Sequence, residues 1–204
     1  MNSSERVARD FQATLAQHVP GQISRVCVIG SPYGMMMCAC AKEGDVRGVR
    51  QALAQVGPAA VNWLDTDSGL SALHCAAAHG RCAVIELLAK ECPDTLNLEE
   101  ITGPEEQHMT ALMMAAAKNK PHALVALVQH GAKLEGVGRE GITALITAAK
   151  EGHLACCAKL LELGAKVDSR TTNGCSALFT AAQYGKVKYI PHREWHRPPR
   201  GATQ

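Results

Sequence analysis

The 204-residue sequence is 47% hydrophobic but only 3% aromatic, so a single large core built on aromatic rings is not expected. Its 21 basic and 19 acidic residues give a net charge of +2, without the basic excess typical of nucleic-acid-binding domains. No run approaches the roughly 18 apolar residues of a membrane span, and the nine scattered cysteines indicate a reduced, soluble, cytoplasmic protein.

The first 33 residues predict one amphipathic helix, with Ser4 as its N-cap and Val7, Phe11 and Leu15 at helical spacing. They lack the apolar core of a signal peptide. Residues 34–64 follow with the stretch "MMMCACAKEGD", in which Met37 stands 36 residues before the leucine of a similar stretch downstream. We interpret residues 34–64 as a degenerate first copy of a unit that recurs along the chain.

Four clearer copies follow in chain order: "GLSALHCAAAHGR", "HMTALMMAAAKNK", "GITALITAAKEGH" and "GCSALFTAAQYGK". Aligned on Leu73, Leu112, Leu145 and Leu178, they lie 39, 33 and 33 residues apart. The 39-residue step contains an insertion between Pro93 and Gln107, which predicts a longer acidic loop. A near-constant period in the thirties is typical of solenoid proteins.

The unit from Gly138 to Arg170 shows how one copy is expected to fold. Gly141 marks a turn and Thr143 can cap a first helix through its hydroxyl oxygen. Gly152 ends that helix in the left-handed region, His153 opens a second helix, and Gly164 ends the second helix. The buried faces of the two helices are predicted from apolar spacing to contain Leu145, Ala148 and Ala149, and then Cys157, Leu160 and Leu161. A polar, extended segment leads to the next unit.

The last copy has only begun its second helix when Pro191 interrupts it. Residues 191–204, "PHREWHRPPRGATQ", predict a basic, disordered tail. Because a repeat array normally ends in a polar capping unit and none is obvious here, the last unit is expected to fray.

The pattern G-x-T-A-L-x-x-A-A-x-x-G-H…L-L-x-x-G-A resembles the ankyrin repeat over residues 65–185, and more weakly over 34–64. The resemblance implies an all-α solenoid of four to five helix-turn-helix units with finger loops, in which residues 65–190 hold the clear repeats. The spelling "TALMxAA" is similar to ankyrin-only and ankyrin-plus-kinase arrays of protists.

Two departures from the family pattern carry structural expectations. Only His74 keeps the histidine of the family motif, and the matching residues are Met113, Ile146 and Phe179. Apolar contacts are therefore expected where the family uses a polar link between neighbouring repeats. Asn119 stands at a helix-ending glycine position, which is tolerable because asparagine visits the left-handed region readily.

Other stretches of the sequence resemble catalytic or metal-binding motifs. "GVGREG", residues 136–141, spells a dinucleotide-binding motif, but no apolar strand precedes it and its last glycine is the repeat's own turn. A Cys/His set could suggest zinc, although its spacing does not match paired zinc ligands. The set comprises Cys38, Cys40, His74, Cys75, His79 and Cys82. Kinase and nucleophile-elbow signatures are absent from the sequence. No cofactor, metal ligand or catalytic residue is expected.

In the ankyrin family, finger loops and the ends of first helices form the concave, partner-binding surface. Carried over by position, the predicted finger residues are Asp67, Ser68, Glu106, Gln107, Arg139, Glu140, Thr172 and Asn173, and the predicted first-helix residues are His79, Lys118, Lys150, Glu151, Gln183 and Tyr184. An apolar column just after the turn adds Leu70, Met109, Ile142 and Cys175. This column could contact a partner or simply pack finger against finger.

These observations predict a non-catalytic, monomeric scaffold or adaptor that binds a protein partner on its concave ankyrin surface, with no role for nucleic acid or membrane. One alternative is a metal-dependent regulator or enzyme that uses the Cys/His set. Another is a truncated array without independent function.

Overall fold

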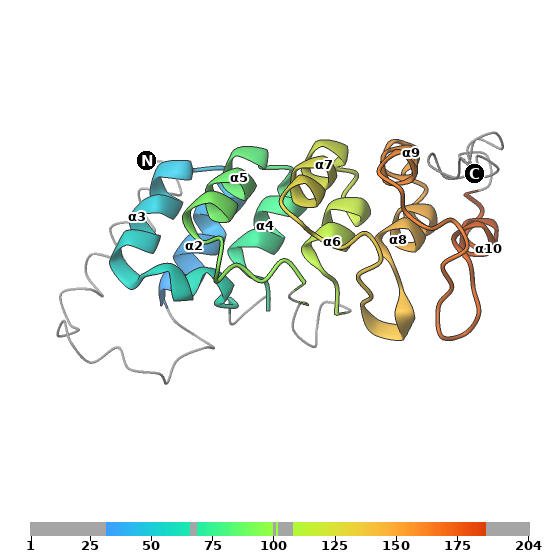
Figure 1. Ribbon diagram of the computed structural model, residues 1–204, viewed down its shortest axis with the longest axis horizontal. Helices are drawn as coiled ribbons and strands as arrows, with labels where there is room; N and C mark the ends of the chain where they lie inside the picture. The colour runs from blue at the N-terminus through green and yellow to red at the C-terminus, as the bar shows by residue number, and fades with distance from the viewer. Residues whose placement is uncertain (1–31, 66–68, 100, 102–107, 187–204) are drawn as a thin grey trace, which may run out of the picture.

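The computed structural model describes residues 32–65, 69–99, 101 and 108–186, and these residues form nine α-helices and two short 3-10 helices. The helices stand in two layers that follow the chain from one end of an elongated molecule to the other (Figure 1). The first-helix layer contains α2 (Pro32–Glu43), α4 (Ala72–His79), α6 (Ala111–Ala117), α8 (Ala144–Glu151) and α10 (Ala177–Gln183). The second-helix layer contains α3 (Val46–Val56), α5 (Cys82–Glu91), α7 (Pro121–Gln129) and α9 (Leu154–Glu162).

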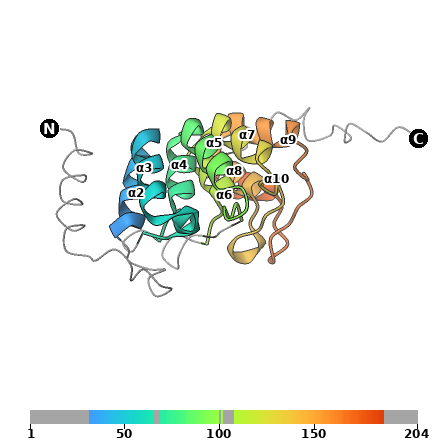
Figure 2. The same ribbon diagram turned by 60° about the vertical axis from the view of Figure 1, so that its left-hand side comes forward.

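Contacts run mainly between nearest neighbours. Successive first helices pack on one another, those from α2 to α8 also pack on the second helix of their own unit, and successive second helices pack in the same order. The loops between units extend to one side of the helices, as both ribbon views show (Figures 1 and 2). Two loops contain the 3-10 turns η1 (Pro58–Asn62) and η2 (Arg139–Gly141). The predicted all-α repeat solenoid is therefore confirmed.

Two expected segments lie outside the described residues. They are the helix predicted around Ser4 to Leu15 and the basic tail that begins at Pro191. Within the part of the chain that the structure describes, no helix is long and apolar enough to cross a membrane.

Hydroxyl side chains begin the first helices. The Thr143 hydroxyl oxygen accepts from the backbone N–H of Ile146, as predicted, and Thr110 and Ser176 do the same for their own helices. Each cap satisfies one of the N–H groups that the first turn of a helix leaves without a partner. This local chemistry explains why a Thr or Ser stands two residues before the leucine of each clear copy.

Residues with a left-handed backbone conformation end these first helices. Gly152 has φ 79° and Asn119 has φ 53°, so the asparagine replaces glycine as the sequence predicted. In both units the next backbone N–H then bonds a carbonyl inside the first helix, from Lys120 to Ala115 at 2.9 Å and from His153 to Ala148 at 2.9 Å. The chain is thereby reversed and directed into the second helix.

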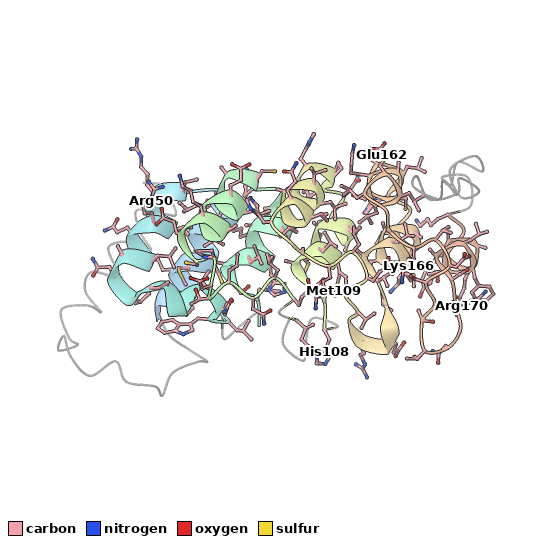
Figure 3. The ribbon with its side chains drawn as sticks, viewed as in Figure 1. Arg50, His108, Met109, Glu162, Lys166 and Arg170 are labelled. Carbon is pink, nitrogen blue, oxygen red and sulfur yellow. The ribbon has the colours of Figure 1, made fainter. Side chains whose placement is uncertain are left out.

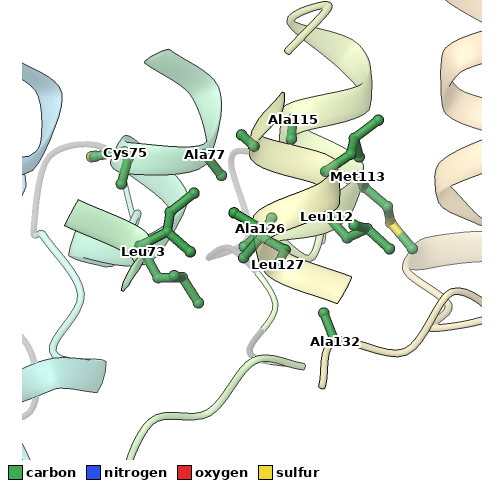
Figure 4. Close-up of a cluster of buried hydrophobic side chains, with 14 of the residues drawn as sticks. Leu73, Cys75, Ala77, Leu112, Met113, Ala115, Ala126, Leu127 and Ala132 are labelled. Carbon is green, nitrogen blue, oxygen red and sulfur yellow. The ribbon is translucent and has the colours of Figure 1, made fainter. Parts of the chain in front are cut away.

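Small side chains bring the layers together. The repeat leucines Leu73, Leu112 and Leu145 are almost completely buried, and most of the alanines beside them have no exposed surface. Figure 4 shows Leu73 and Leu112 in the interior with Leu127 from α7. Each buried leucine contributes about 1.5–3 kcal/mol, while the alanines allow the helices to approach closely. Leu178 differs, because no described element covers it and about half of its side-chain surface is exposed.

The family's polar link between repeats survives at one position. His74 is fully buried, with its Nδ1 atom 2.8 Å from the Ser71 hydroxyl and its Nε2 atom 3.2 Å from the Met109 carbonyl oxygen in the next unit. Met113 and Ile146 occupy the matching positions and are buried, which confirms the expected apolar contact there. Phe179 remains exposed.

Glutamates also link successive units, which the sequence did not predict. Glu99 lies within the predicted acidic insertion, and its carboxylate accepts from the backbone N–H of Lys133 at 2.7 Å. Glu135 repeats the arrangement one unit later, accepting from the backbone N–H of Lys166 at 2.7 Å and from the Ser169 hydroxyl. Hydrogen bonds to a carboxylate are stronger than neutral ones, so these links fix the spacing between loops.

Candidate functional site

A pocket of about 220 Å³ opens between α6, α8 and the loops that precede them. It lies on the face formed by the first helices and the finger loops, which we call the inner face. Its lining comprises His108, Met109, Met113, Met114, Ala117, Lys118, Gly138, Arg139, Ile142, Thr147, Lys150 and Glu151. His108 and Met109 lie on the loop side of α6, whereas Arg50 and Glu162 on second helices lie at the opposite edge (Figure 3).

The pocket floor is apolar and rich in sulfur. Met109 and Ile142 follow the turns of two successive fingers, and both are half-buried against the core. Met113 and Met114 lie beneath them on α6 and are almost fully buried. Thioether side chains adjust to neighbours of different shape, so this floor can accept more than one apolar group.

The pocket rim is positively charged. Lys118 follows α6, Lys150 lies in the last turn of α8, and Arg139 lies on η2, while Glu151 is the one acidic residue among the lining residues. The Lys150 ammonium lies 5.4 Å from the centre of the Tyr184 ring, a cation–π distance. Across the described ranges, the ion pairs formed do not include any of these four charged side chains.

Glycine makes the close approach of the two fingers possible. A Cβ on Gly138 would lie against the carbonyl oxygen of His108 and 3.1 Å from the sulfur of Met113. A Cβ on Gly136 would lie against the Glu99 carboxylate, and Gly141 has φ 72°. The Gly138 backbone N–H donates to the Ile142 carbonyl at 3.0 Å. The "GVGREG" glycines therefore serve finger packing, and this amide is not free to bind a phosphate.

Six of the residues predicted for partner binding meet in this pocket, and they come from the finger set, the first-helix set and the apolar column. They are Met109, Lys118, Arg139, Ile142, Lys150 and Glu151. Four further predicted residues, Asp67, Ser68, Glu106 and Gln107, lie outside the described residues.

The remaining predicted residues are not among those that line the pocket. Thr172 pairs with Glu140, since its backbone N–H and its hydroxyl both reach the Glu140 carbonyl oxygen, at 2.8 and 3.2 Å. Leu70 is half-buried and its carbonyl accepts from the Cys38 thiol at 3.2 Å, so it contributes to packing. His79 is exposed on α4 with its Nδ1 atom 3.0 Å from the Cys75 carbonyl. Asn173, Gln183 and Tyr184 are exposed, and Cys175 is half-buried.

Sequence reasoning missed several lining residues. His108 stands just before the apolar column, while Met114 and Thr147 occupy one repeat position on α6 and α8. Met113 and Met114 are almost fully buried, so both also pack within the array. The sequence did carry one signal for Met114 and Thr147, because their position varies between units (Cys75, Met114, Thr147 and Thr180) while the next position is alanine in all four.

The cysteines of the Cys/His set are buried or half-buried, and their thiols have different surroundings. The described cysteines are free thiols, and burial raises the pKa of Cys40 and Cys156 to about 11 and that of Cys157 to about 12. A hydrogen bond with Cys75, together with burial, also raises the pKa of the Cys38 thiol. A raised pKa disfavours the thiolate, which is the nucleophile and metal ligand, whereas the hydrogen bond with Cys38 lowers the pKa of the Cys75 thiol. Among the described residues, no group of three or more His, Cys, Asp or Glu is placed to hold a metal ion.

Comparison with protein families identifies the architecture. The family model for ankyrin repeats, which describes three copies, matches residues 35–136, 91–171 and 112–192. A search of curated proteins gives no match. Ankyrin repeats are generally protein–protein interaction modules, and proteins of this kind are typically non-enzymatic. Because the matches together span residues 35–192, the chain belongs to the ankyrin-repeat family.

Proposed function

We propose that this protein is a non-catalytic interaction scaffold or adaptor that binds a segment of a partner protein on its inner face. One observation carries the proposal: the pocket between α6 and α8 gathers residues of two repeats into an apolar floor with a charged rim. A depression of this kind suits a protruding side chain of a partner, and residues around it would add weaker contacts.

The chemistry of the thiols and histidines supports the non-catalytic proposal over a metal-dependent regulator or enzyme. The raised pKa values of Cys40, Cys156 and Cys157 keep these thiols protonated at neutral pH. His74 contacts Ser71 and a backbone carbonyl, so it already has a structural role. Free thiols also accord with the proposed cytoplasmic location, because cytosolic proteins keep cysteine reduced.

We further propose that residues 34–64 act as the first unit of the array, that residues 65–190 form its clear repeats, and that the protein is a monomer. The helix pair α2 and α3 supports the first of these, because α2 packs on α4 and α3 packs on α5 as in later units. The similarity to protist arrays stays a prediction.

An affinity pull-down from extract of the source cell tests the proposed function. The intact chain is compared with a variant that removes three inner-face side chains, Lys118→Ala, Arg139→Ala and Glu151→Ala. A control with the same change in net charge removes three exposed side chains away from the pocket, Glu86→Ala, Lys90→Ala and Lys133→Ala. All three proteins must show the same helical content by circular dichroism.

The expected result is a partner that the intact chain and the control retain and the inner-face variant loses. That partner, expressed alone, should bind the purified chain directly. Equal retention by all three proteins contradicts the inner-face proposal. If nothing specific is retained by any of them, the hypothesis of an array without independent function is favoured.

A further inference from the structure

We propose that the pocket between α6 and α8 takes one apolar side chain from a partner segment whose flanking residues are acidic. This inference rests on the proposed function, and it adds the chemical class of the segment. The volume and apolar floor of the pocket support a single apolar side chain, and the charges of its rim support the acidic flanks.

The size of the pocket fits a single side chain. Sites for whole small molecules usually enclose about 300–1,000 Å³, whereas this pocket encloses about 220 Å³. Its accessible floor is formed by Met109 and Ile142, with Met114 below. An aliphatic or aromatic side chain would displace water from this apolar surface and gain free energy by burial. A free ligand of metabolite size would remain largely exposed.

The rim charges point to acidic flanks. Three cations surround the floor against one carboxylate, that of Glu151. Lys118 and Lys150 have a structural explanation, because basic groups near helix C-termini complement the helix dipole. Arg139 has no such structural explanation, because it lies on the short turn η2 and not at the C-terminus of an α-helix, and it is exposed. An exposed guanidinium over an apolar floor is suited to pair with a carboxylate of a docked segment.

A nucleic acid fits the same surface less well. Proteins that bind single strands without base specificity stack bases on aromatic side chains, and no phenylalanine, tyrosine or tryptophan lines this pocket. The Glu151 carboxylate would also repel a phosphate backbone. A peptide can place an apolar residue on the floor and avoid Glu151 through its choice of sequence.

Selection from a phage-displayed library of random peptides against the full chain tests the inference. A representative of the enriched peptides is then synthesised with a fluorescein label, and its affinity is measured by fluorescence polarisation. The rim variant is Lys118→Gln, Arg139→Gln and Lys150→Gln. The control variant removes the same charge elsewhere, Lys90→Gln, Lys133→Gln and Lys166→Gln. A second peptide replaces the apolar residue with serine, which tests the floor without changing the protein.

We expect enriched peptides that share one apolar residue between aspartates or glutamates. The rim variant should bind the representative peptide about tenfold more weakly, as the loss of three exposed ion pairs implies. The control should stay within about twofold. The serine peptide should lose about tenfold or more, and added salt should weaken binding of the parent peptide.

The outcomes separate this inference from the proposed function. Enriched peptides without acidic residues, or with unchanged affinity for the rim variant, overturn the acidic-segment inference and leave peptide binding intact. Displacement of the peptide by a single-stranded oligonucleotide of mixed sequence overturns the assigned partner class. If the intact chain enriches no peptide at all, both the inference and the proposed peptide-binding function fail.

Discussion

Gly138→Ala is the substitution that most directly tests how the fingers and the pocket are built. The backbone at Gly138, with φ −92° and ψ −151°, lies in the extended region, so the expected cost is steric. The added Cβ would lie against the His108 carbonyl oxygen and 3.1 Å from the Met113 sulfur. Overpacking costs about 1–3 kcal/mol, and the reduced entropy of the unfolded chain offsets about 0.4–1 kcal/mol. We therefore expect the free energy of unfolding to fall by about 1–2 kcal/mol.

For a chain of this length, such a loss lowers Tm by about 2–8 °C, which melting followed by circular dichroism can resolve. Gly174→Ala serves as a comparison, because Gly174 has φ 78° and no atom within 4 Å of an added Cβ. That variant should lose about 1–2 kcal/mol through backbone conformation alone. Only Gly138→Ala should also weaken peptide binding, since it displaces Met113 at the pocket floor. An unchanged Tm for Gly138→Ala would refute the close finger contact.

Three further predictions concern stability, and urea unfolding followed by circular dichroism checks each. His74→Ala should lower the free energy of unfolding by about 2–4 kcal/mol, because it removes a fully buried side chain together with its contacts to the Ser71 hydroxyl and to the Met109 carbonyl of the next unit. A loss below 1 kcal/mol would contradict the link. Leu145→Ala should lower the free energy of unfolding by about 2–5 kcal/mol. Leu178→Ala should lower it by less than half as much, because Leu178 is 48% exposed. Equal losses would show that another part of the chain covers Leu178 on α10. Burial raises the pKa of Cys156 to about 11 and that of Cys157 to about 12, from a usual value of 9.0. Because the unfolded chain loses these thiol protons at lower pH than the folded chain, the free energy of unfolding should decline from pH 9 towards pH 12. The decline should be less steep in a variant with both cysteines changed to alanine.

The elements of each repeat could be predicted from the sequence because local chemistry determines them. A Thr143 hydroxyl that caps a helix, or a left-handed residue such as Asn119 that ends one, acts within a few residues of its own position. Helix starts and stops therefore follow from short stretches, and the period gives the stacking order.

The pocket could be predicted only in part. The register of the repeats predicts Lys118, Arg139 and Lys150 on one face, and all three line the pocket. Met114 and Thr147 of the next unit both line the pocket, and that opening depends on how the two units pack, which is a tertiary property. The Glu99 and Glu135 links were missed for a related reason, since loops of unequal length precede them and no constant period marks them.

The glutamate links have a consequence for exchanging repeats between arrays. Each link joins a side chain of one unit to a main-chain N–H of the next, at Lys133 and Lys166. The receiving unit can therefore carry any residue except proline at that position, because only proline lacks the N–H group. A donor unit must bring its own glutamate. Shuffling whole units, with joints placed after Glu99 or Glu135, should then preserve the spacing of the array while the inner face is freely varied.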